Sequence, residues 1–146
     1  MSVKKDTYKI QAQTIIKNLA RRNMEGFYCD TREDAVKKAL EIMEKGSVIA
    51  WGGSESIKEC GLMEAISDGS YELIDRTKDV TPDEQRKMYA SIVMSDYYLM
   101  STNAITLDGE LVNIDGNGNR VAALIHGPAH VLIIAGMNKV TADVES

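Results

Sequence analysis

Apolar residues recur along the chain with two spacings, one typical of a helix and the other of a buried strand. Between residues 8 and 23 they return every three or four positions, which predicts a helix whose basic end precedes Gly26. Residues 26–30 (GFYCD) have the composition of a short strand. A second helix is predicted to begin near Thr31 and to stop at Gly46.

The middle of the chain continues this alternation. Residues 47–51 (SVIAW) form a continuous apolar run, as expected for a parallel strand that is covered on both faces. Residues 55–67 have a helical pattern in spite of Gly61, and residues 71–75 (YELID) predict a strand. Residues 81–84 (TPDE) combine a capping hydroxyl, a proline and two acids, so they predict the start of a helix.

This last helix is expected to run to about Ser95 and to be followed by a strand over residues 97–102 (YYLMST). Residues 105–114 contain two β-prone arms around the dipeptide Asp108-Gly109, which is the strongest hairpin signal in the chain.

The remaining segments complete the pattern. Residues 116–127 predict a helix, residues 130–136 predict a buried strand, and residues 138–146 begin a further element. Since strands and helices alternate almost throughout, we predict an α/β fold with a mainly parallel sheet sandwiched between helices and right-handed crossovers. A β-hairpin is expected near residues 104–114.

Composition narrows the class of protein. The 146 residues are 44% hydrophobic, which suits one domain, 1–146, with a core of its own. The formal net charge is -5 and the basic residues are scattered, which argues against nucleic acid as a partner. No apolar segment approaches the roughly 20 residues of a membrane span, and none resembles a signal core. We therefore expect a soluble cytoplasmic protein with no membrane partner.

The cysteines and histidines do not indicate a metal site. Cys29 and Cys60 lie far apart in the sequence and in dissimilar settings, so reduced and buried thiols are expected. His126 and His130 are separated by Pro128, which breaks the helix that would place both on one face.

Three loops follow predicted strands, where open α/β sheets bind their ligands. In the first, Gly52-Gly53-Ser54, backbone N–H groups can approach an anion next to a helix N-terminus. The same residues equally suit a tight turn in which Ser54 is an ordinary N-cap. The lysine of a P-loop and the third glycine of a dinucleotide motif are missing, so neither ATP nor NAD is favoured.

The other two loops are polar as well. Residues 101–105 (STNAI) can hold a carboxylate or a sugar hydroxyl, or can simply turn the chain. In residues 113–122 (NIDGNGNRVA), Arg120 suits either a ligand anion or an ion pair with Asp115. Together the three loops favour a concave polar site at one edge of the sheet. The acids in or near the loops are Glu55, Glu59, Asp108 and Asp115.

Several of these segments together resemble a known family. They are WGGSESIKECGL, YELIDR, TPDEQRKMYASIVMSDYYLMSTNAIT, DGELVNIDGNGNRVAALIHGP and VLIIAGMNKV. In this order, from about Thr7 to Val144, they are similar to the LUD domain, the lactate-utilisation domain of the B and C proteins of bacterial lactate oxidation operons. The resemblance implies the fold shared by ribose-5-phosphate isomerase, glucosamine-6-phosphate deaminase and the CoA transferases.

The resemblance implies motif residues but no catalytic role for them. These residues are Gly52, Gly53, Ser54, Asp75, Arg76, Ser101, Asn103, Asp108, Gly109, Asn113, Asp115, Gly116, Asn119 and Arg120. The B protein carries iron-sulphur cysteine motifs that this chain lacks, so no cofactor is implied. Family members usually continue past residues 138–140 (NKV) with a helix and a cysteine-bearing segment, and we expect the chain to lack that part.

The leading hypothesis is a LUD-domain protein that binds a small anionic metabolite, a hydroxy or keto acid or a sugar phosphate, in the metabolism of L-lactate to pyruvate. Asp115 or Glu55 would be the acid or base if there is chemistry. The candidate ligand-binding residues are Gly52, Gly53, Ser54, Ser101, Thr102, Asn103, Asp108, Asn113, Gly116, Asn119 and Arg120.

Two alternatives stay open. The first is a sugar-phosphate isomerase or CoA transferase-like enzyme with a carboxylate at the strand edge, although Thr and Asn occupy residues 101–106 (STNAIT) where isomerases carry an acid. The second is a non-catalytic subunit that docks other lactate-oxidation proteins, with Met88, Tyr89 and Met94 on the docking helix. A homo-oligomer is compatible with each hypothesis.

Overall fold

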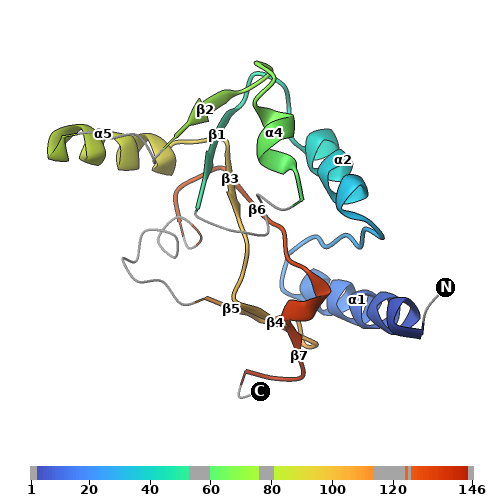
Figure 1. Cartoon of the computed structure of the whole chain (residues 1–146). Helices are drawn as coiled ribbons and strands as arrows, with labels where there is room; N and C mark the ends of the chain where they lie inside the picture. Colours follow the sequence, from blue (N-terminus) through green and yellow to red (C-terminus); the bar gives the residue numbers. More distant parts are fainter. Residues whose placement is uncertain (1–2, 53–59, 76–80, 114–123, 125, 145–146) are drawn as a thin grey trace. The chain divides into compact units, whose positions relative to one another are not determined.

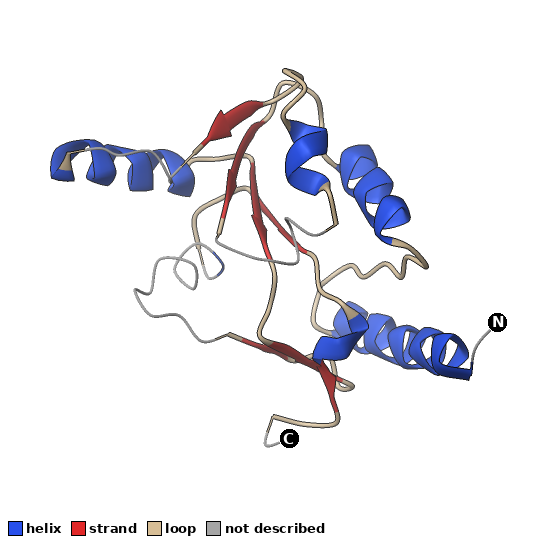
Figure 2. Cartoon of the chain, in the orientation of Figure 1, coloured by secondary structure: helices blue, strands red, loops and turns tan. Residues whose placement is uncertain are grey.

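The computed structural model describes residues 3–52, 60–75, 81–113, 124 and 126–144 (Figures 1 and 2). The chain divides into two compact units. The hairpin unit consists of Met1–Thr31, Thr102–Ile114 and Ala135–Ser146. The sheet unit consists of Arg32–Ser101 and Asp115–Ile134.

The sheet unit contains a four-stranded parallel sheet. Its strands are β1 (Val48–Trp51), β2 (Glu72–Ile74), β3 (Tyr97–Met100) and β6 (His130–Ile133), in the spatial order β2-β1-β3-β6. Every pair of neighbours runs parallel. The α/β class, the parallel sheet and all four strands of this sheet are therefore confirmed.

Helices cover both faces of this sheet, as the apolar run of β1 predicts. On one face Ile49 and Leu99 pack with buried residues of α2 (Arg32–Ile42) and α4 (Leu62–Ile66). On the other face Tyr98 packs with Ile92 of α5 (Pro82–Val93). Figure 1 shows α5 on the opposite side of the sheet from α2 and α4. Each large apolar side chain that is fully buried contributes about 1.5–3 kcal/mol, so this sandwich holds the core.

The helix starts follow local chemistry. Thr81 is the N-cap of α5, and its hydroxyl accepts a hydrogen bond of 3.2 Å from the backbone N–H of Glu84. The predicted helix over residues 55–67 is wrong at Gly61, whose φ of +87° interrupts it. This left-handed conformation makes Gly61 the N-cap of the short helix α4, whereas residues 55–59 lie outside the described part.

The hairpin unit is built from segments that are far apart in the sequence. Helix α1 (Val3–Arg21) begins five residues earlier than predicted. The hairpin strands β4 (Ala104–Thr106) and β5 (Leu111–Val112) are antiparallel, which confirms the hairpin around Asp108-Gly109. The 3-10 helix η1 (Met137–Lys139) leads into β7 (Val140–Thr141), which pairs parallel with β4. This second sheet, in the order β5-β4-β7, was not expected as a separate sheet.

Other predictions need correction. Residues 26–30 do not form a strand, and Gly26 lies against α1: a Cβ added there would lie 3.0 Å from side-chain atoms of Ile16 and Leu19. The helix predicted up to Ser95 ends at Val93. The Ser95 hydroxyl donates to the carbonyl of Ile92 at 2.7 Å and so satisfies one of the last carbonyls of the helix. The helix predicted over residues 116–127 lies mostly outside the described residues.

Candidate functional site

The carboxyl ends of the parallel strands carry the first group of candidate residues. Strand β1 is followed by Gly52, β2 by Asp75 and β3 by Ser101. Trp51 lies beside Leu99 in the ladder, and the backbone N–H of Gly52 donates to the carbonyl of Leu99 at 2.9 Å. Gly52 and Ser101 therefore lie at the same edge of the sheet, where parallel α/β sheets bind ligands.

The geometry at Gly52 restricts what this residue can do for an anion. Gly52 is buried, and its N–H is already engaged in the sheet ladder. Donors for an anion at this turn would therefore have to come from Gly53 and Ser54, which lie outside the described residues.

Ser101 and Asp75 complete this edge. Ser101 is buried at 4% exposure, whereas Asp75 is half-buried. Both residues have interactions within the protein. A buried hydroxyl and a carboxylate at the ends of the two strands that flank β1 are groups that can orient the hydroxyls of a ligand.

The second group of candidates lies in the hairpin unit, at the open end of the β4–β5 hairpin. The backbone N–H of Asn103 and the hydroxyl of Thr102 both donate to the carbonyl of Val112, at 3.0 Å each. The Thr102 hydroxyl also lies 3.1 Å from the carbonyl of Ala104. Thr102 is 1% exposed, so its hydroxyl proton serves the backbone of the hairpin rather than solvent.

Asn113 follows Val112 directly and brings an unusual feature to the same end of the hairpin. Its Oδ1 atom is buried and has no hydrogen-bond partner among the described residues. Leaving a buried acceptor unpaired costs about 1–3 kcal/mol, so buried polar groups are nearly always paired. This oxygen is an acceptor that a hydroxyl or an N–H group could satisfy.

Asp108 and Gly109 have a structural role. Asp108 is exposed at the hairpin turn, and its carbonyl accepts from Nε of Arg22 at 3.3 Å. Gly109 has a φ of +85°, and a Cβ there would lie 3.1 Å from backbone atoms of Asn18 and Leu19. The Asp-Gly dipeptide therefore allows the turn to lie directly on α1.

Several sequence-predicted residues lie outside the described part of the chain. They are Gly53, Ser54, Glu55, Asp115, Gly116, Asn119 and Arg120. Both candidate acid-base residues and the candidate cation of the site are among them. The structure thus brings Gly52 together with Ser101 in the sheet unit and Thr102 with Asn103 and Asn113 in the hairpin unit.

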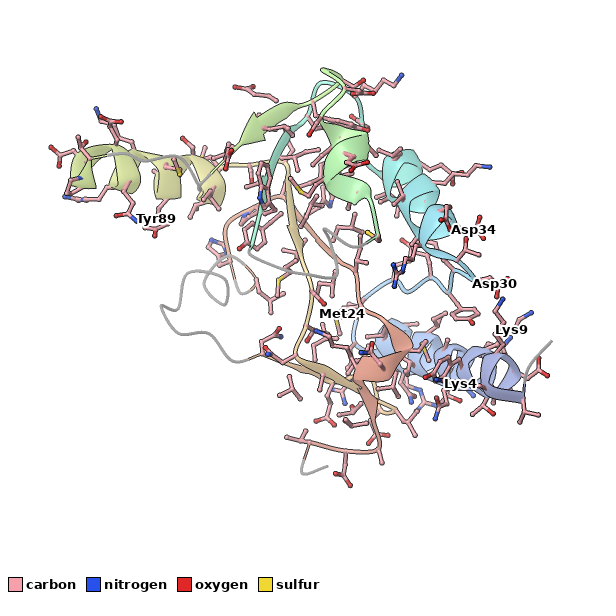
Figure 3. The ribbon with its side chains drawn as sticks, in the orientation of Figure 1. Lys4, Lys9, Met24, Asp30, Asp34 and Tyr89 are labelled. Atoms are coloured by element: carbon pink, nitrogen blue, oxygen red, sulfur yellow. The ribbon has the colours of Figure 1, made fainter. Side chains whose placement is uncertain are left out.

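The predicted docking helix is partly core. In α5, Met88 packs on the buried cluster that contains Ile92, whereas Tyr89 is 37% exposed and Met94, just after the helix, is 82% exposed. Figure 3 shows Tyr89 on this helix. Only the exposed members of the stripe are available to a partner.

Two classes of site find no support in the described residues. Within them, no three His, Cys, Asp or Glu side chains gather in a way that could hold a metal ion. None of their helices combines the length and the apolar character that crossing a membrane requires.

Comparison with protein families decides the classification. The model of the LUD domain matches residues 12–146, which include most of the hairpin unit and all of the sheet unit. The chain belongs to the LUD domain family. No curated protein matches it in sequence. The family membership agrees with the motif segments, and it places the protein at a coarse level among lactate-utilisation-like proteins.

Proposed function

We propose that this LUD-domain protein binds a small anionic metabolite and acts in carboxylate metabolism of the kind that converts L-lactate to pyruvate. The observation that carries the proposal is the position of Gly52 and Ser101 at the shared carboxyl edge of β1 and β3. In a parallel sheet this edge is the usual place for a ligand. The ligand class is a hydroxy acid, a keto acid or a sugar phosphate.

The proposed roles follow the chemistry of each group. Gly53, Ser54 and Arg120 hold the anion, because backbone N–H groups and a guanidinium both pair well with carboxylate or phosphate. Ser101 orients a hydroxyl of the ligand at the carboxyl edge of the sheet unit. Thr102 holds the start of β4 in place through its bond to Val112.

Within the hairpin unit, the buried oxygen of Asn113 is an acceptor in its own right for a group that carries a hydroxyl. A hydroxyl donates a hydrogen bond to this acceptor and removes the cost of leaving it unpaired. Asp115 or Glu55 is the acid or base in this proposal if the bound metabolite is converted.

The test is a thermal-shift screen of the full chain against lactate, pyruvate, other small carboxylates, pentose and hexose phosphates and CoA thioesters. A ligand at about 100 times its Kd stabilises the folded state by about 2.7 kcal/mol, which raises Tm by several degrees. We expect at least one carboxylate or phosphate to do so, and Arg120→Ala to abolish the shift.

The matched control is Arg86→Ala, which removes an exposed arginine from α5 and is expected to leave the ligand shift unchanged. Arg120→Lys distinguishes paired recognition from charge alone, since lysine keeps the charge but lacks the planar fork. The proposal would be contradicted if no compound of the panel raised Tm, or if Arg120→Ala showed the same ligand-induced rise in Tm as the unchanged protein.

A further inference from the structure

A cavity of about 350 Å³ lies at the amino ends of the parallel strands of the sheet unit. We call it the amino-edge cavity. It is lined by Glu44, Lys45, Gly46, Ser47, Asp96, Tyr97, Ala129 and His130. The cavity is open to solvent, and its lining is mainly polar.

This cavity is separate from the carboxyl edge. Tyr97 and Ser101 lie at the two ends of β3, and four residues of an extended strand span about 13 Å. The ligand proposed above therefore has no contact with the amino-edge cavity. A negative result at one of the two sites leaves the proposal for the other unaffected.

Asp96 is held rigidly in the wall of the cavity. Its backbone N–H donates to the carbonyl of Val48 at 2.9 Å, and its own carbonyl accepts from the N–H of His130 at 2.9 Å. Its Oδ2 accepts from the N–H of Val48 at 2.8 Å. The second carboxylate oxygen, Oδ1, makes no hydrogen bond with any described residue and can accept one from a ligand.

A fixed pair of rings forms another part of the wall. The rings of Tyr97 and His130 are stacked, with their centres 5.1 Å apart and an angle of 24° between their planes. The hydroxyl of Tyr97 donates to the carbonyl of Ile42 at 3.2 Å and anchors the phenol ring. His130 is exposed, so its imidazole ring is accessible to a ligand although it stacks on Tyr97.

The charges of the lining favour a cation. The lining residues include two acidic residues, Glu44 and Asp96, and one lysine, Lys45, which together carry a formal charge of -1. Guanidinium is the cation that best matches such a lining, because it is planar, pairs with carboxylates through two parallel N–H donors and stacks on aromatic rings.

We propose that the amino-edge cavity binds a small molecule that carries a guanidinium group. The guanidinium donates to Oδ1 of Asp96 and to the carboxylate of Glu44, and its plane lies on the exposed His130 ring. The rigid Asp96 and the stacked rings mean that little ordering is needed when the ligand binds.

The test is an NMR titration of the full chain with n-butylguanidine, followed through the ring signals of His130 and Tyr97 at about pH 8, where histidine is ordinarily neutral. The chain has two histidines, so His126→Gln assigns the His130 signal. The matched probe is n-butylamine, which has the same chain and charge but no planar fork. We expect saturable shifts with n-butylguanidine and a Kd about tenfold lower than that of n-butylamine.

Variants locate the binding. Glu44→Gln and Asp96→Asn are each expected to weaken n-butylguanidine binding about fivefold or more, because each removes one charged acceptor. Asparagine keeps an oxygen for the N–H of Val48, so the fold is retained. Glu41→Gln removes an exposed carboxylate of α2 that does not line the cavity, and is expected to change nothing. Equal affinity for the two probes, no saturation up to about 10 mM, or unchanged binding in Glu44→Gln would overturn the proposal.

Discussion

At the scale of single residues, the structure separates groups that serve the backbone from groups that are available to a ligand. The N–H of Gly52 and the hydroxyl of Thr102 both donate to backbone carbonyls. Asn113 differs from them, because its buried oxygen has no partner among the described residues. Polar residues in one family motif therefore have different physical roles, which composition alone does not distinguish.

Replacing Asn113 tests this difference. Asn113→Leu has nearly the same shape but lacks the unpaired oxygen, so the free energy of unfolding is expected to stay unchanged or to rise by up to about 1 kcal/mol. Chemical denaturation followed by circular dichroism measures this change.

The matched control for this variant is Asn18→Leu. Nδ2 of Asn18 donates to the carbonyl of Leu107 at 2.8 Å, so its loss is expected to lower the free energy of unfolding by about 1–2 kcal/mol. A comparable loss of stability in Asn113→Leu would show that the carboxamide of Asn113 is satisfied in solution.

At the scale of elements, local signals predicted those starts and turns that neighbouring residues alone determine. The N-cap Thr81 and the hairpin turn at Gly109 are examples, since a hydroxyl and a left-handed glycine act over three or four residues. The strand predicted for residues 26–30 failed because strand formation depends on a neighbouring strand, which no local pattern supplies. Here the segment packs on α1 instead.

Gly109 links one such turn to a helix. Gly109→Ala is expected to cost about 2–4 kcal/mol, because it combines a left-handed backbone with a Cβ that would lie 3.1 Å from backbone atoms of α1. Gly69→Ala is the control, since φ there is +95° but nothing lies within 4 Å of the added Cβ. We expect this control to cost only about 1–2 kcal/mol in the same denaturation measurement. Equal losses in the two variants would mean that Gly109 does not lie against α1.

At the scale of the whole molecule, alternation of strands and helices was enough to predict a parallel sheet with helices on both faces. It did not predict the second sheet, because β7 pairs with β4 across a long separation in sequence, Ile105 with Val140. The same limit applies to the sites. The carboxyl edge could be located from loop composition, whereas the amino-edge cavity is lined by three separate segments with no shared motif.

At this scale we predict how a substitution in the core of the sheet unit changes the free energy of unfolding. Leu99 is 0% exposed in a strand with neighbours on both sides, so Leu99→Ala is expected to lower the free energy of unfolding by about 2–5 kcal/mol. Ile10→Ala removes an apolar side chain that is 64% exposed and is expected to change stability by no more than about 0.5 kcal/mol. A loss below about 1 kcal/mol in Leu99→Ala would be incompatible with a sheet that is covered on both faces.

The long-range pairing within the hairpin unit has a consequence for the order of synthesis. Along the chain α1 comes before the hairpin and β7 comes well after it, so one side of β4 lacks its partner strand until residues 140–141 are available. The parallel pair β1 and β2 is complete long before that point. An unpaired strand edge invites contact with other chains, so the interval before β7 pairs with β4 is the one in which the hairpin unit is most exposed to misassembly.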